Sequence, residues 1–123
     1  MKVLVVDDSR VIRLRIVAML RDVPGVESVI EAADGVQALQ RIAQQSPDLV
    51  VLDLNMPRLG GLDVLRTVKK SARPPFIVIH TSHGTDHHRA ECLRLGADAF
   101  CDKSESFDTV LALVSQRVAS LGA

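Results

Sequence analysis

Tryptophan and tyrosine are absent from this chain, and phenylalanine occurs only three times. Binding of single-stranded nucleic acid relies on bases stacking on aromatic side chains, so this composition argues against it. The chain also lacks net charge, because 15 Lys and Arg residues balance 15 Asp and Glu residues. No basic excess is left to attract DNA, RNA or an anionic membrane. We therefore expect neither nucleic acid nor membrane among its partners.

Signals for export or membrane insertion are missing too. The first residues reach acid at Asp7, too early for a signal peptide, and no apolar run is long enough to span a bilayer. Two cysteines, Cys92 and Cys101, form no CxxC pair and are best explained as reduced thiols. We expect a cytoplasmic protein.

Apolar residues make up 47 % of the 123 residues, enough for one packed domain spanning 1–123. Short apolar runs that predict strands lie at 3–6, 28–32, 49–52, 76–80 and 97–102. Each is followed by a stretch with helical spacing: after Ser9, around 39–43, at 62–70, at 86–95 and at 107–118. Strands joined by helix-length crossovers predict an α/β, doubly wound parallel sheet. No linker or second domain is expected, hence no output domain in this chain.

Polar residues follow four of the five predicted strands. Asp7 and Asp8 follow the first, Asp53 the third, Thr81 the fourth and Lys103 the fifth. Right-handed crossovers bring the carboxyl ends of parallel strands to one edge of the sheet, where open α/β sheets bind ligands. We expect these residues to converge on one crevice.

The residue types in that crevice suit phosphoryl chemistry. Three neighbouring carboxylates repel one another unless a cation intervenes, and an all-oxygen ligand set favours Mg²⁺. Lys103 adds a second positive charge and Thr81 a hydroxyl donor. A carboxylate, a divalent cation, a lysine and a hydroxyl together make a phosphoryl site. Asp53 is the best candidate for its nucleophile, because the adjacent Asp7 and Asp8 suit metal binding.

The whole chain resembles the receiver domain of two-component response regulators, in its stand-alone, chemotaxis-regulator-like form. The resemblance rests on the acidic pair 7–8, the motif Asp-Leu-Asn-Met-Pro at 53–57 with glycines at 60–61, Thr81, and Gly-Ala-Asp at 96–98 leading to Lys103. It implies a flavodoxin-like fold with strand order 2-1-3-4-5 and five helices. It also implies that Asp53 accepts a phosphoryl group from a sensor histidine kinase or phosphotransfer protein. The implied Mg²⁺ ligands are Asp7, Asp8, Asp53 and the backbone carbonyl of Asn55.

The resemblance further implies a switch. Lys103 would pair with the phosphoryl oxygens, Thr81 would move to hydrogen-bond them, and Phe100 would swing inward behind Thr81. The surface formed by the fourth helix, fifth strand and fifth helix would change, which alters binding to a downstream protein target and permits a phosphorylation-dependent dimer. Such a chain is a phosphoacceptor switch and not an enzyme, apart from assisting its own phosphorylation and dephosphorylation.

The sequence departs from the family pattern at several positions. Ser104 replaces the usual proline after the lysine and is expected to loosen the path into the fifth helix. Ser82 follows Thr81 where alanine is common. Asn55 and His83, each two residues past a site residue, occupy positions that tune water access in the family, so the phosphoryl lifetime stays open.

Plainer interpretations exist for each residue. Asp53 can cap a loop, Asp7 and Asp8 can cap a helix, Lys103 can be a solvated lysine, and Thr81 and Phe100 can be ordinary strand or core residues. Histidines occur at 80, 83, 87 and 88, and the spacing of His83 and His87 permits a zinc-binding pair, but nothing completes a tetrahedral set. We interpret the four histidines as polar loop and helix-start residues near the mouth of the crevice. The arginines of the first helix, at 10, 13 and 15, suit a solvated face, although in the family this helix often meets the kinase.

Three other functions are weighed against the switch. A haloacid-dehalogenase-like phosphatase needs an acid two residues after the nucleophile, where this chain has Asn55. A pseudo-receiver that binds without phosphorylation is disfavoured by the intact set of Asp7, Asp8, Asp53 and Lys103. A piece of a longer DNA-binding regulator is the third alternative.

Overall fold

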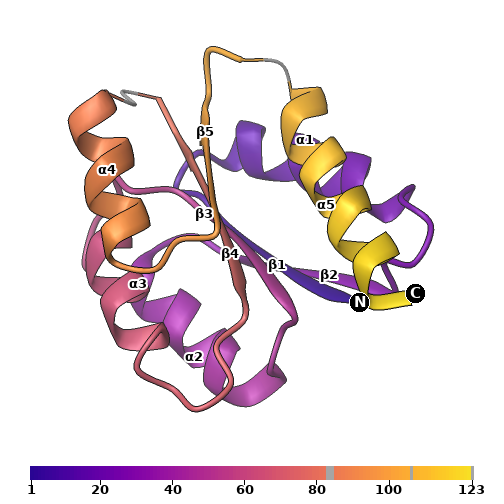
Figure 1. The fold of residues 1–123 in the computed structure, drawn as a ribbon, viewed down its shortest axis with the longest axis horizontal. Coiled ribbons are helices and arrows are strands. Elements are labelled where there is room, and N and C mark those ends of the chain that lie inside the picture. The colour runs from indigo at the N-terminus through magenta and orange to yellow at the C-terminus, as the bar shows by residue number, and fades with distance from the viewer. Residues whose placement is uncertain (83–84, 106, 123) are drawn as a thin grey trace.

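The computed structural model describes residues 1–82, 85–105 and 107–122, in which five strands alternate with five helices (Figure 1). The strands are β1 (Lys2–Val6), β2 (Ser28–Ala32), β3 (Leu49–Leu52), β4 (Phe76–Thr81) and β5 (Ala99–Asp102). The helices are α1 (Arg10–Arg21), α2 (Gly35–Gln45), α3 (Gly61–Val68), α4 (Asp86–Arg94) and α5 (Phe107–Gly122). All the strand pairs are parallel, in the order β2-β1-β3-β4-β5. The predicted fold class and strand order are confirmed.

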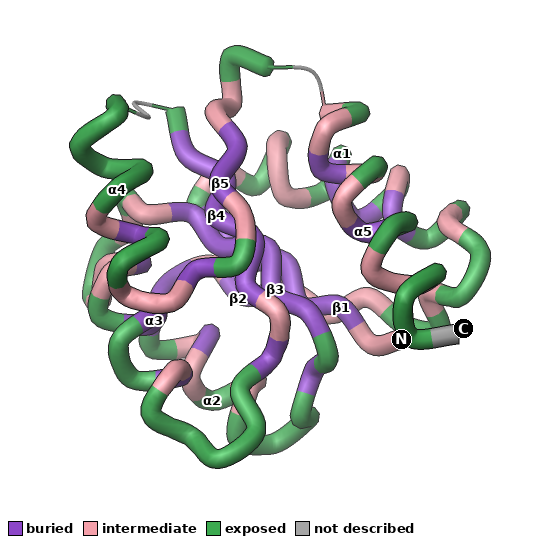
Figure 2. The backbone as a smooth tube through the Cα atoms, in the orientation of Figure 1, coloured by how far each residue is buried: buried purple, intermediate pink, exposed green. Residues whose placement is uncertain are grey.

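The sheet is the middle of three layers, with α1 and α5 on one face and α2, α3 and α4 on the other (Figure 1). Alternate residues of β1 supply the two cores: Val3 and Val5 pack on the α1/α5 side, while Leu4 and Val6 pack on the opposite side. All four residues of β3 are buried, which explains why that strand is an unbroken apolar run (Figure 2).

The predicted bounds of several elements differ from the structure, and hydrogen bonds explain two of these differences. Strand β5 begins at Ala99 and not at residue 97, because the Asp98 carboxylate accepts hydrogen bonds from the backbone of Ile77 and from Lys69 Nζ. The Ala97 amide donates back to Cys92, so residues 97–98 complete the exit from α4. Helix α3 spans 61–68 and not 62–70, since the amides of Lys69 and Lys70 close a turn at its end.

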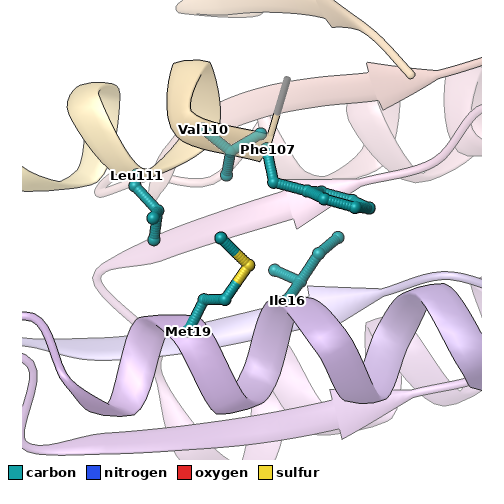
Figure 3. Close-up of a pocket in the computed structure, with 5 residues that line it drawn as sticks. All are labelled: Ile16, Met19, Phe107, Val110 and Leu111. Carbon is teal, nitrogen blue, oxygen red and sulfur yellow. The ribbon is translucent and has the colours of Figure 1, made fainter. Parts of the chain in front are cut away.

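Ser9 caps helix α1, because its Oγ accepts a hydrogen bond from the Ile12 amide. Its buried face includes Ile16, Val17 and Leu20. Against α5 the helix presents Ile16 and Met19, which face Phe107, Val110 and Leu111 (Figure 3). No space for a water molecule is left between these five side chains. This contact therefore fixes α1 against α5 and leaves no room for a ligand between them.

Candidate functional site

The sheet's hydrogen-bond ladder continues one residue beyond three of its strands. The Asp53 amide donates to the Val6 carbonyl at 3.0 Å, the Asp7 amide to the Ala32 carbonyl at 3.2 Å, and the Lys103 amide to the Thr81 carbonyl at 2.7 Å. The backbones of these three residues are therefore held by the sheet itself and not by a free loop. Rigid elements hold a site more precisely than loops do.

Asp7, Asp8 and Asp53 form an acidic cluster at this edge. One carboxylate oxygen from each lies within 4.8 Å of the others, and it is the one group of three such ligands found among the described residues. Asp7 and Asp53 are 1 % and 3 % exposed, whereas Asp8 is exposed. The cluster has two fixed carboxylates and one that faces solvent, which fits a hard cation that keeps some of its water.

Lys103 bridges the two buried carboxylates. Its Nζ lies 2.9 Å from Asp7 Oδ2 and 3.2 Å from Asp53 Oδ2. Burial opposes the charge of this lysine, but the bonds and charges of Asp7 and Asp53 outweigh that effect and raise its pKa. Lys103 is thus a permanently charged group beside the proposed nucleophile. The predicted convergence of Asp7, Asp8, Asp53 and Lys103 is confirmed.

Asp53 is the carboxylic acid of this site whose pKa is raised by folding. Burial raises its pKa to about 6; Lys103 opposes the shift, and the charge of Asp7 adds to it. Because folding raises this pKa, the stability that protonated Asp53 contributes is present below pH ~4 and is lost as the pH rises through about 6. A bound cation would favour the ionised form and so compete with the proton.

This competition predicts a pH dependence. Between pH 5 and pH 7 the ionised fraction of a carboxyl with a pKa near 6 rises roughly tenfold, so Mg²⁺ affinity should rise by about that factor. Isothermal titration calorimetry at the two pH values measures it. The Asp53→Asn variant should show a much flatter profile. Equal Mg²⁺ affinity at both pH values in the wild-type protein would contradict the raised pKa.

Asp7 is locked in place from three sides. Its Oδ1 accepts the Ser9 amide at 2.8 Å, its Oδ2 meets Lys103, and its carbonyl accepts Arg13 Nη1 at 2.7 Å. Arg13 also pairs with Glu31 at 2.9 Å, and its side chain is only 14 % exposed. The prediction that Arg13 lies on a solvated face is therefore wrong. Its long stem reaches back from α1 to the end of β1, which helical spacing cannot reveal.

Thr81 is the last residue of β4, and Phe100 lies in the neighbouring strand β5. Thr81 is 1 % exposed and lies opposite Asp102 in the β4–β5 strand pair. Phe100 lies opposite Ile79 in the same pair and is 8 % exposed. The Arg89 guanidinium of α4 lies 5.2 Å from the centre of the Phe100 ring. The two residues assigned to the switch are thus buried on adjacent strands, and Arg89 of α4 covers the Phe100 ring.

Ser104 uses the backbone amide that a proline would lack. That amide donates to Asp102 Oδ1 at 2.8 Å, and the Glu105 amide donates to the Asp102 carbonyl at 3.0 Å. The Glu105 carboxylate in turn accepts the Asp102 amide at 3.3 Å. These bonds close the turn that follows β5 and hold it in the absence of proline.

The three described histidines, at 80, 87 and 88, do not form one cluster. His80 is 2 % exposed, its ring lies 5.9 Å from that of Phe107, and burial lowers its pKa. His87 and His88 are exposed on α4, and His83 lies outside the described residues. Within the described part of the chain no group of three ligands includes a histidine. His80 is a neutral core residue and not a crevice-mouth group, which corrects the interpretation drawn from its neighbours in sequence.

A wide groove lies away from the acidic cluster. A groove of about 780 Å³ runs past the starts of β3 and β4, where Asp48, Phe76 and Arg117 are among its lining residues. None of the predicted site residues lines it. The charged residues predicted for the site therefore gather at the carboxyl edge of the sheet and not in this groove. No helix in the described ranges is long and apolar enough to cross a membrane.

This fold and this cluster together define the class. A five-stranded parallel sheet of order 2-1-3-4-5, with three aspartates and a lysine at its carboxyl edge, is the arrangement of a receiver domain. The family model described as "Response regulator receiver domain" matches residues 3–115, and the chain belongs to that family. Proteins of this family act in two-component signalling.

Curated relatives include two methylesterases. The chain is 42 % identical over 114 residues to "Protein-glutamate methylesterase/protein-glutamine glutaminase 1" of Myxococcus xanthus, covering 90 % of this chain and 32 % of that protein. It is 39 % identical over 122 residues to "Protein-glutamate methylesterase/protein-glutamine glutaminase 5" of the same organism, covering 98 % of this chain and 33 % of that protein. The chain spans about a third of the length of these relatives, so their names describe much longer proteins.

Solved receiver structures superpose on the whole chain. The response regulator domain of Thermotoga maritima CheB has a TM-score of 0.82 at 30 % identity, covering 98 % of this chain and 94 % of that one. The signal receiver domain of a Luxo repressor protein from Vibrio parahaemolyticus has a TM-score of 0.85 at 28 % identity, with the same coverage.

Proposed function

We propose that this chain is a phosphorylation-dependent signalling switch, a single receiver domain over residues 1–123, in which Asp53 is the phosphoacceptor. The observation that carries the proposal is the position of Asp53: buried, within 4.8 Å of two further carboxylates and 3.2 Å from Lys103 Nζ. The donor would be a phosphohistidine on a sensor histidine kinase or phosphotransfer protein in the cytoplasm. The downstream target is a protein.

The donor set fits Mg²⁺. Asp7, Asp8 and Asp53 supply carboxylate oxygens close enough to share one ion, and all the ligands are hard oxygens. The Asn55 carbonyl is the fourth proposed ligand, and its amide already lies 3.4 Å from Asp53 Oδ1. When bound, magnesium neutralises charge on the transferring phosphoryl group and orients it for attack.

The residues of the chain have distinct roles in the transfer. A carboxylate oxygen of Asp53 attacks the phosphorus, the bond from phosphorus to the donor imidazole nitrogen breaks, and its electron pair stays on that nitrogen, which then takes a proton. Lys103 moves from carboxylate to phosphoryl oxygens, a shift of partners that needs little movement because its Nζ already contacts Asp53. Asn55 offers no acid for a phosphatase cycle.

The signal leaves the site through Thr81 and Phe100. The Thr81 hydroxyl turns towards the phosphoryl group, and the space that it leaves lets the Phe100 ring move further inward, away from Arg89. The two residues lie on adjacent strands and Phe100 contacts Arg89 of α4, so movement of its ring changes the surface made by α4, β5 and α5. That surface is where a target or a second phosphorylated copy would bind.

The Asp8→Ala substitution tests the metal role. The variant keeps both buried carboxylates but loses the exposed ligand, so phosphorylation by acetyl phosphate in Mg²⁺ should slow by at least about tenfold. Intact-protein mass against time measures the rate. Asp63→Ala, which removes an exposed aspartate paired with Arg66, is the matched control and should keep the wild-type rate. An Asp8→Ala protein that is phosphorylated at the wild-type rate, with full Mg²⁺ dependence, would refute this role.

A further inference from the structure

An ion pair joins two loops beside the acidic cluster. Arg58, in the loop between β3 and α3, donates from both Nε, at 3.0 Å, and Nη2 to Asp34 Oδ2, at the turn between β2 and α2. The Asp34 side chain is only 8 % exposed. Its other oxygen, Oδ1, accepts the Gln37 amide at 2.8 Å and caps α2. One buried carboxylate thus anchors a helix start and the loop that follows the phosphoacceptor strand.

The backbone of Arg58 is strained. Its φ of 68° is left-handed, a conformation that side chains other than glycine rarely adopt. The Leu59 amide bonds to the Pro57 carbonyl at 2.8 Å and closes a tight turn around it. Strain of this kind persists only where the surroundings hold the residue in place. Here the two bonds to Asp34 are the contacts that hold the side chain.

Close backbone contacts fix the same loop near both ends. A Cβ on Gly35 would lie 2.1 Å from the Leu59 carbonyl oxygen, so the start of α2 rests on the loop. A Cβ on Gly61 would lie 2.2 Å from the Asp53 carbonyl oxygen, so the start of α3 rests on the phosphoacceptor's own backbone. Asn55, the residue proposed to offer a carbonyl to Mg²⁺, lies in the segment between these contacts.

We infer that Arg58 is a positioning residue: through its ion pair with Asp34 it holds residues 54–60 in the conformation that keeps Asn55 beside Asp53, where the Asn55 amide lies 3.4 Å from Asp53 Oδ1. This inference rests on the proposed function, because it assigns Arg58 to the same metal site. An exposed ion pair alone would add little. This pair differs because its carboxylate is buried, receives two donors and secures a strained backbone. The Gln37 amide, and then Arg58, also lower the pKa of Asp34, so the pair stays charged.

Two variants test whether the Arg58–Asp34 ion pair itself holds the loop. Arg58→Gly removes the guanidinium but tolerates the left-handed φ, so the backbone conformation remains accessible. Asp34→Asn keeps an oxygen that can cap α2 but weakens the charged pair with Arg58. Arg66→Ala is the control, since it removes an arginine whose ion-pair partners are Asp63 on α3 and Glu91 on α4, outside residues 54–60.

Amide hydrogen exchange of metal-free protein and Mg²⁺ titration calorimetry are the measurements. In Arg58→Gly we expect exchange across residues 54–60 to quicken roughly tenfold and Mg²⁺ affinity to fall by roughly tenfold, with a melting temperature near that of Arg66→Ala. Adding Asp34→Asn to Arg58→Gly should weaken Mg²⁺ binding little further, because the pair is already broken.

An Arg58→Gly protein with wild-type exchange in 54–60 and wild-type Mg²⁺ affinity would overturn the inference. The exchange measurement needs no metal, so it stands apart from the proposed function. Failure of the wild-type protein itself to bind Mg²⁺ would instead overturn the metal site on which the inference depends.

Discussion

Replacing Asp53 by asparagine should leave a folded protein that gains no phosphoryl group from acetyl phosphate in Mg²⁺. The asparagine amide is nearly the same size but is not a nucleophile for phosphorus, and neighbouring Asp7 and Asp8 are proposed as metal ligands. Intact-protein mass should show the addition of one phosphoryl group in the wild-type protein and none in the variant.

Stability separates this result from misfolding. In metal-free buffer at pH 7 the variant should be more stable than wild type by about 1–3 kcal/mol, because it removes a buried charge whose pKa folding raises to about 6. Urea unfolding at pH 7 and at pH 4 measures this, and the difference should shrink at pH 4. An Asp53→Asn protein phosphorylated as fast as wild type would make another residue the acceptor.

Substituting Gly61 by alanine should damage both fold and site. The added Cβ would lie 2.2 Å from the Asp53 carbonyl oxygen and 2.7 Å from Leu54 Cα. Both are backbone atoms, so relieving the overlap requires a shift of the main chain that costs free energy. Overpacking of this kind lowers the free energy of unfolding by about 2–3 kcal/mol, more than the gain from alanine's helix propensity. Because the contact is with Asp53 itself, phosphorylation should slow as well.

Gly60→Ala is the matched control one residue earlier. Its Cβ would meet only the Leu54 carbonyl oxygen at 3.5 Å, an ordinary contact, and its φ of −75° suits any residue. Urea unfolding should place it within about 0.5 kcal/mol of wild type. Equal stability of the two variants would show that α3 can move away from Asp53, contrary to the close packing described here.

The sequence predicted the sheet and its polar edge because both follow from local rules. Apolar runs of strand length alternate with helical spacing, and a parallel sheet brings strand ends together whatever their separation in sequence. The pairing of Lys103 with Asp7 and Asp53 was therefore foreseeable from the position of each residue directly after a strand. The resemblance to receivers supplied the strand order, which the pattern alone could not.

Other features depend on contacts that local patterns do not encode. The Arg58–Asp34 pair joins residues 24 apart through a left-handed arginine, where the pattern would favour glycine. His80 was grouped with exposed histidines, yet the alternation of β4 turns it inward towards Phe107. Arg13 was assigned to solvent because helical spacing says nothing about how far a long side chain reaches. Close glycine contacts were equally invisible, although the Gly60-Gly61 pair marked the loop.

The most direct test of the central claim is chemical identification of the acceptor. Wild-type protein is treated with acetyl phosphate with and without Mg²⁺, then reduced with borohydride, which converts an aspartyl phosphate to homoserine, and its peptides are mapped by mass. We predict homoserine at position 53 alone and only with Mg²⁺. Modification at Asp7 or Asp8, phosphate on a histidine, or no Mg²⁺-dependent product would contradict Asp53 as the phosphoacceptor.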